Sequence, residues 1–134
     1  MSLAGTYNFR LQRGADFSRV FVKNTEADDG TLTPVDLTGL KVRAQFRDPE
    51  YATGTTTSDT LLLGLEDSDG IEITDAAGGE ITLTLTNAQT ATLCPNNVKT
   101  VVAYGIEIYD DGVSPEVVTP FLQGKVTIYP ETVR

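Results

Sequence analysis

Hydrophobic and polar side chains alternate most regularly in residues 80–86. Ile81, Leu83 and Leu85 are separated from one another by polar residues, and this period of two is typical of a β-strand with one face in water. Residues 102–109 repeat the same period with larger apolar side chains. We therefore predict two half-buried strands in these two segments.

The segment that joins them, residues 87–93 (Asn87 to Leu93), predicts a short helix. Asn87 offers the side-chain oxygen of an N-cap, and Pro95 lies just beyond the last position that favours a helix. We expect about one and a half helical turns here.

Six further segments have an alternating pattern or a high content of strand-forming residues, and turn-forming residues separate them. They are residues 7–12, 16–23, 41–47, 61–63, 70–74 and 118–129. Between them, residues 24–33 predict a hairpin or loop with a tight turn at Asp29 and Gly30. The Gly-, Thr- and Ser-rich residues 50–59 predict a mobile loop.

About seven to eight short strands separated by turns indicate an all-β protein. A strand, a short helical crossing and a second strand often link the two sheets of an immunoglobulin-like (Ig-like) sandwich. No internal repeat or linker divides the 134 residues, and that length suits one domain. We expect an Ig-like sandwich of antiparallel strands that spans residues 1–134, with the helix as a connector.

Charge argues against two classes of partner. The chain has 10 Lys+Arg and 19 Asp+Glu, a net charge of −9, which repels nucleic-acid phosphates and anionic lipid. Arg10, Arg13, Arg19 and Lys23 are spread along two predicted strands, so they form no basic run. Residues 1–6 lack the pattern of a signal peptide, and no apolar run approaches the ~20 residues of a membrane span. We expect synthesis in the cytoplasm, with neither nucleic acid nor membrane as a partner.

Catalytic residue types are scarce. The sequence has no histidine and a single cysteine, Cys94, which excludes Ser-His-Asp and Cys-His catalysis and zinc sites built from histidine or several thiolates. Neither GxGxxG nor GxxxxGK[ST] occurs. A carboxylate pair for glycoside hydrolysis stays open among the 19 acids, although tryptophan, which often stacks on sugars, is absent. We predict a protein without enzymatic activity or cofactor.

Three acids just before Gly70 are the candidate metal ligands. Glu66, Asp67 and Asp69 offer the hard oxygen atoms that calcium prefers. Their spacing does not fit an EF-hand loop, whose third acid and distal glutamate are missing. Turns also collect Asp and Gly for backbone reasons, so we predict a solvated turn and keep calcium binding as the alternative.

A local excess of positive charge lies on the outward face of the strand predicted at residues 41–47. Lys41, Arg43, Gln45 and Arg47 share that face. One interpretation is the ordinary solvated face of a strand. The other is an interface that meets an acidic protein neighbour, or a second copy of the chain, through charge-assisted hydrogen bonds.

Several stretches resemble small virion proteins of tailed bacteriophages. They are Tyr7–Asn8–Phe9, Gln12 to Arg19 with the turn Gly14–Ala15–Asp16, Val35 to Leu40, Arg43 to Arg47, Gly79 to Thr90, Tyr104 to Ile108, Leu122 to Ile128 and Pro130 to Arg134. These stretches are similar to the Ig-like N-terminal domain of phage upper baseplate proteins and to stand-alone phage proteins of about this length. The resemblance implies a family that attaches receptor-binding parts to the tail or decorates the particle.

The long C-terminal extension of the baseplate proteins is not found here, so the resemblance implies a connector or accessory subunit of the tail, baseplate or fibre. Its partners would be other phage structural proteins or further copies of itself, and its location the virion. A capsid decoration (cement) protein is one alternative. A carbohydrate-binding module for host polysaccharide is another, with Tyr51, Tyr109 and Tyr129 as candidate stacking residues.

Overall fold

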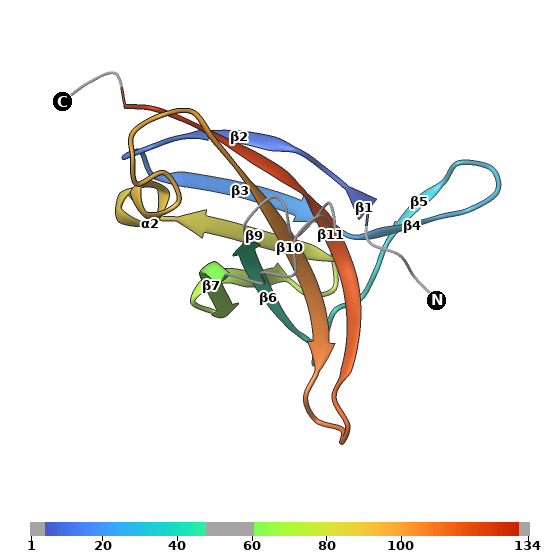
Figure 1. Ribbon diagram of the computed structural model, residues 1–134. Coiled ribbons are helices and arrows are strands. Elements are labelled where there is room, and N and C mark those ends of the chain that lie inside the picture. Colours follow the sequence, from blue (N-terminus) through green and yellow to red (C-terminus); the bar gives the residue numbers. More distant parts are fainter. Residues whose placement is uncertain (1–4, 48–60, 132–134) are drawn as a thin grey trace.

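The computed structural model describes residues 5–47 and 61–131, and residues 1–4, 48–60 and 132–134 lie outside the description (Figure 1). The described strands are β1 (Gly5–Thr6), β2 (Phe9–Gln12), β3 (Phe17–Val22), β4 (Asn24–Glu26), β5 (Leu32–Pro34), β6 (Lys41–Arg47), β7 (Leu61–Asp67), β8 (Gly70–Asp75), β9 (Glu80–Leu85), β10 (Thr100–Asp110) and β11 (Val117–Tyr129). One short helix, α2 (Asn87–Thr92), joins β9 to β10. The prediction of an all-β protein is confirmed.

The strands form one curled sheet in the order β1-β11-β10-β6-β7-β8-β9-β3, and β2 also pairs with β11. Strands β4 and β5 form a separate two-stranded hairpin that projects from the body (Figure 1). β1 and β2 both run parallel to β11, and β7 runs parallel to β8. The expectation of purely antiparallel strands is therefore wrong. Side-chain alternation has the same period in both kinds of ladder, so it does not report strand direction.

Alternating side chains build the core as the sequence predicts. Ile81, Leu83 and Leu85 are fully buried on β9, and Phe46 is fully buried on β6. β10 departs from a simple alternation, because buried residues follow one another along it. Part of its outer face is covered as well, because the Arg43 guanidinium lies over the Tyr109 ring.

The inner face of β3, left open by the sequence, carries Phe17, Arg19 and Phe21, while Val20 and Val22 are exposed. Residues 24–34 form the hairpin that the turn residues predicted. The expected loop at residues 50–59 lies outside the described residues.

Helix α2 confirms the predicted connector but not its cap. The N-cap is Thr86, whose Oγ1 accepts a hydrogen bond from Gln89 N while Gln89 Oε1 accepts one from Thr86 N. This reciprocal capping box follows from the Thr-x-x-Gln spacing, so the expectation of Asn87 as N-cap is wrong. Asn87 N instead donates to Asp16 Oδ1 at 2.7 Å. Among the described residues, no helix is long and apolar enough to cross a bilayer.

Candidate functional site

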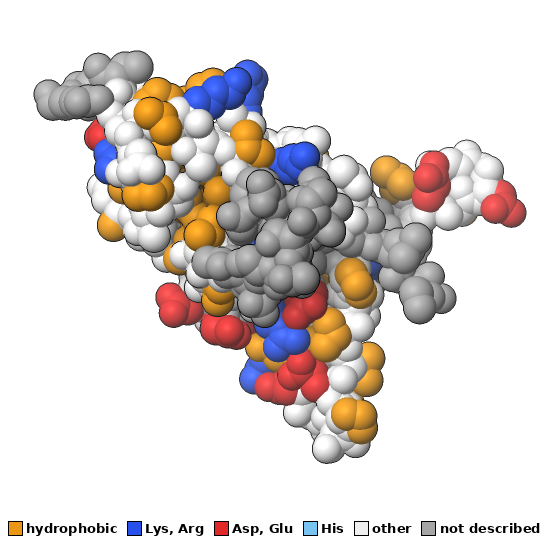
Figure 2. All heavy atoms as spheres, viewed as in Figure 1, with side chains coloured by type: hydrophobic (Ala, Val, Ile, Leu, Met, Phe, Trp, Pro, Cys, Tyr) orange, Lys and Arg blue, Asp and Glu red, His pale blue; other side chains and the backbone are white. Residues whose placement is uncertain are grey.

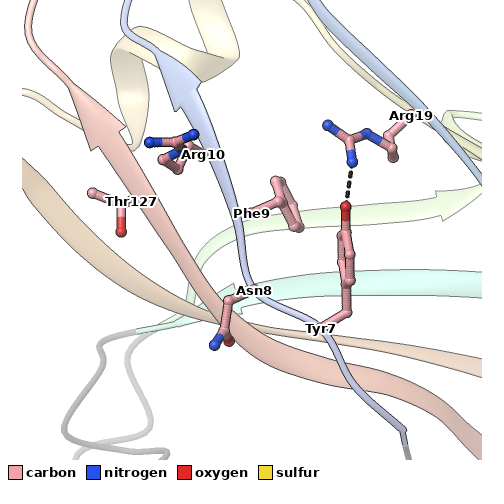
Figure 3. Close-up of a pocket in the computed structure, with 6 residues that line it drawn as sticks. All are labelled: Tyr7, Asn8, Phe9, Arg10, Arg19 and Thr127. Atoms are coloured by element: carbon pink, nitrogen blue, oxygen red, sulfur yellow. Dashed lines mark hydrogen bonds between the residues drawn. The ribbon is translucent and has the colours of Figure 1, made fainter.

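A hollow of about 520 Å³ lies between β2 and β3 (Figure 3). β2 pairs with β11 and β3 pairs with β9, and among the described strands no ladder joins β2 to β3. The hollow therefore opens where the curled sheet is not closed by backbone hydrogen bonds. It is lined by Tyr7, Asn8, Phe9, Arg10, Arg19 and Thr127.

Aromatic side chains connect β2 to β3 in place of a backbone ladder. Phe9 stacks on Phe17 with ring centroids 5.3 Å apart, and Tyr7 meets Phe21 edge-on at 5.7 Å. Phe9 also packs edge-on against Tyr104 of β10 at 4.9 Å. Each such pair stabilises by about 0.5–1.5 kcal/mol beyond its buried area. The rings hold the two strands side by side and leave the facing strand edges without a ladder.

Two arginines lie on either side of Phe9 in this hollow (Figure 3). Arg19 Nη1 donates a hydrogen bond to the Tyr7 hydroxyl, and its guanidinium lies 5.8 Å from the Tyr7 ring centroid. Arg10 projects from β2 next to Thr127, its partner in the ladder with β11. Among the described residues neither arginine forms an ion pair. We refer to this feature as the Arg10–Arg19 hollow.

Contacts with β10 and β11 fix the position of Tyr7 and Asn8. Lys125 N donates to Asn8 Oδ1 at 2.9 Å, and the Tyr104 hydroxyl donates to Tyr7 O. Burial raises the pKa of Tyr104, so this hydroxyl stays protonated and remains a donor at neutral pH. A Cβ at Gly124 would lie 2.3 Å from Tyr7 O. Only a glycine allows the two strands to approach this closely, and that approach positions the edge of the hollow.

The chemistry available in the Arg10–Arg19 hollow is anion binding. Guanidinium groups bind carboxylates through charge-assisted hydrogen bonds, and the neighbouring rings offer apolar contact. Sequence reasoning treated Arg10 and Arg19 as separate positions on two strands and did not predict that both line one hollow. The signal that could have found it is the short turn at Gly14, whose φ is +79°. A tight turn brings the two segments that flank it back toward each other.

The basic stripe of Lys41, Arg43, Gln45 and Arg47 does share one face of β6, as predicted. Its charges, however, meet partners from the same chain. Arg43 pairs with Glu107 of β10 and, at 2.9 Å, with Glu116. Its guanidinium also lies 4.4 Å from the ring centroid of Tyr109.

The two ends of the stripe are engaged as well. Lys41 Nζ lies 2.7 Å from Asp111 Oδ2, and Arg47 Nη2 donates to Gln45 Oε1 at 2.8 Å. Figure 2 shows basic and acidic side chains interleaved in the lower part of the body, above the projecting end of the β10–β11 hairpin. A partner would therefore meet paired charges here, and the role of the stripe as an interface stays a prediction.

Replacing Lys41 with methionine is expected to raise the pKa of Asp111. The hydrogen bond from Lys41 holds the pKa of this exposed carboxyl below its ordinary value of 3.8. A lowered folded-state pKa stabilises the fold above the ordinary value, and that contribution is lost as pH falls through the folded pKa. Carboxyl ¹³C NMR titration measures the change. Lys99→Met is the control, and an Asp111 pKa that does not move in the Lys41 variant would contradict the assigned cause.

The acids of the candidate calcium turn are not all in a turn. Glu66 and Asp67 belong to β7, and Asp69 follows in the turn before β8. Asp67 Oδ1 accepts a hydrogen bond from Val42 N at 3.1 Å, so this carboxylate satisfies the backbone of β6. Across residues 5–47 and 61–131, no group of three or more His, Cys, Asp or Glu side chains is placed to hold a metal ion.

The candidate sugar-stacking residues do not form a common platform. Tyr109 is buried and covered by the Arg43 guanidinium. Tyr129 is exposed, with Lys99 Nζ 5.6 Å from its ring centroid. Tyr51 lies outside the described residues.

Comparison with protein-family models finds none that matches this chain, and no curated protein matches it either.

Proposed function

We propose that this protein is a non-enzymatic structural subunit of a tailed-bacteriophage particle. It is a connector or accessory protein of the tail, baseplate or fibre and docks on other virion proteins. The stretches at residues 7–19 and 79–90, which resemble phage virion proteins, support this assignment. An Ig-like sandwich is part of the same proposal. The all-β body and the short helix between β9 and β10 are consistent with it.

The observation that carries the docking role is a pair of projecting hairpins (Figure 1). One is β4–β5, where Leu32 is 61% exposed. The other is the far end of β10–β11, where Val113 and Val118 are exposed and Val117 is 58% exposed. Apolar side chains exposed on a projecting hairpin favour contact with a protein partner, because removing their surface from water lowers the free energy.

The ion-paired face of β6 fits the same role. Lys41, Arg43 and their acidic partners give this face little net charge on a chain whose net charge is −9. Copies and neighbours can approach a balanced surface more closely than a strongly acidic one. Packing at high local density in a particle is easier with such a face.

The proposal predicts that the chain is present at a fixed copy number in purified particles. Virions of the phage that encodes the chain are purified and separated on a density gradient into heads and tails. The chain is then quantified by mass spectrometry against the major head and tail proteins. Recovery with tails supports the connector role, and recovery with heads supports the capsid-decoration alternative. Absence from both fractions would overturn the virion assignment.

A glycan array tests the remaining alternative. Specific binding of a host polysaccharide by the purified chain would favour a carbohydrate-binding module over a purely structural subunit. A Tyr129→Ala variant is the matched probe, because the structure describes two of the candidate tyrosines, Tyr109 and Tyr129, and of these Tyr129 is exposed.

A further inference from the structure

We infer that the Arg10–Arg19 hollow binds carboxylates, and that its occupant is the β4–β5 hairpin of a second copy of this chain. Copies would then associate through a contact between two different surfaces, the hollow of one and the hairpin of the other. This inference goes beyond the virion assignment and does not depend on it, because it concerns the purified chain alone.

The first step is the distribution of counter-charges. Arg13, Lys41 and Arg43 all form ion pairs with carboxylates of the same chain. Arg10 and Arg19 form none with the described residues, although acids outnumber bases in the sequence by 19 to 10. Both line the same hollow. Each of these guanidiniums can therefore form charge-assisted hydrogen bonds with a carboxylate that enters the hollow.

The second step is an acidic surface without cations. The hairpin of residues 24–34 carries Glu26, Asp28 and Asp29, and it contains no Lys or Arg. All three acids are exposed, and none forms an ion pair with the described residues. Figure 2 shows acidic side chains on the part that projects from the body. We refer to residues 24–34 as the acidic hairpin.

The third step is that both surfaces also have an apolar part. On the acidic hairpin, Leu32 lies opposite Glu26 in the ladder and is 61% exposed. In the hollow, Tyr7 is 36% exposed, and its ring lies beside Arg19. Leu32 can therefore pack on Tyr7 while carboxylates reach the arginines. Ion pairs surrounding an apolar contact are typical of specific interfaces.

The fourth step concerns access. The acidic hairpin is two strands wide and projects away from the sheet (Figure 1). The hollow opens where β2 and β3 have no ladder between them. A narrow projection on one copy thus meets an opening on another. Because the two surfaces differ, the contact is heterologous, the type that builds rings or filaments from identical subunits.

Sedimentation analysis from about 10 μM to 1 mM tests the inference. We expect the weight-average mass of the wild-type chain to rise with concentration. The hollow variant Arg10→Gln/Arg19→Gln and the hairpin variant Glu26→Gln/Asp28→Asn/Asp29→Asn are each expected to associate at least about tenfold more weakly. A chain that stays monomeric over the whole range would overturn the inference.

Mixing the two variants gives the decisive result. The intact acidic hairpin of the hollow variant can enter the intact hollow of the hairpin variant, while the opposite contact has no charges. We expect the mixture to form pairs that do not grow further. A mixture that behaves as the separate variants do would contradict the proposed contact.

A matched control removes two positive charges elsewhere. Lys23→Gln/Lys99→Gln changes the net charge by the same amount and also removes two cation–ring contacts, at Phe121 and Tyr129. It should associate as the wild type does. Arg19 contacts the rings of Tyr7 and Phe17, so Arg10→Gln alone is the hollow variant that should disturb folding least. Thermal melts of all variants verify that they are folded. Equal loss of association in the control would overturn the role of the hollow.

Discussion

Replacing Phe46 with alanine is expected to lower the free energy of unfolding by about 3–5 kcal/mol. Phe46 is 0% exposed on β6, which lies between β10 and β7 in the sheet. Its ring centroid is 6.3 Å from that of Tyr104, and Tyr104 in turn packs on Phe9 beneath the hollow. Alanine would remove the ring and leave a cavity that the central strands cannot close. Urea unfolding followed by circular dichroism measures the loss.

Val22→Ala is the matched control for Phe46→Ala. Val22 is also an apolar strand residue, but its side chain is exposed on β3. Its removal should change the free energy of unfolding by no more than about 0.5 kcal/mol. If both substitutions had equally small effects, the core assigned to β6 would be wrong.

Replacing Gly79 with alanine is expected to cost about 2–6 kcal/mol and to loosen the base of the acidic hairpin. Gly79 has a φ of +68°, which alanine adopts with about 1–3 kcal/mol of strain. The added Cβ would lie 2.6 Å from Lys23 O and 2.9 Å from Val35 O, and forcing those backbone atoms apart adds about 1–3 kcal/mol.

Hydrogen exchange at two amides locates the effect of Gly79→Ala. Lys23 N donates to Gly79 O, and Val35 N donates to Lys23 O, each at 2.9 Å. Both amides should lose protection in the variant. Gly39→Ala is the control, because Gly39 has a φ of +81° but a Cβ added there would meet nothing within 4 Å beyond its chain neighbours. An equal cost in both variants would mean that backbone strain alone, without the clash, explains the result.

The strands that the sequence predicts best are those whose burial alternates without interruption. In β6 and β9, one face is covered by the core and the other meets solvent, so burial and sequence share the period of two. Residue type alone does not decide the cap of α2, because Thr86 and Asn87 are both good N-cap residues. The Gln89 side chain decides between them by completing the capping box at Thr86.

The candidate site was less accessible to prediction because its parts come from distant segments. The hollow needs β2 beside both β11 and β3, and side-chain periodicity does not say which strands are neighbours. The stripe on β6 was predicted as a charged face, but Glu107 and Glu116 neutralise Arg43 from the β10–β11 hairpin. Pairing at such separations depends on topology, which local sequence does not encode.

The pairing of β2 with β11 also sets the order in which the chain can fold. Asn8 and Lys125, which meet at this junction, are 117 residues apart. A ribosome therefore releases β1 and β2 long before it makes the strand that they pair with. Contacts between residues so far apart in the sequence form slowly, so closure of the sheet is a late event of biosynthesis. Until β11 has been made, the strand edges of β1 and β2 that pair with it have no hydrogen-bond partner.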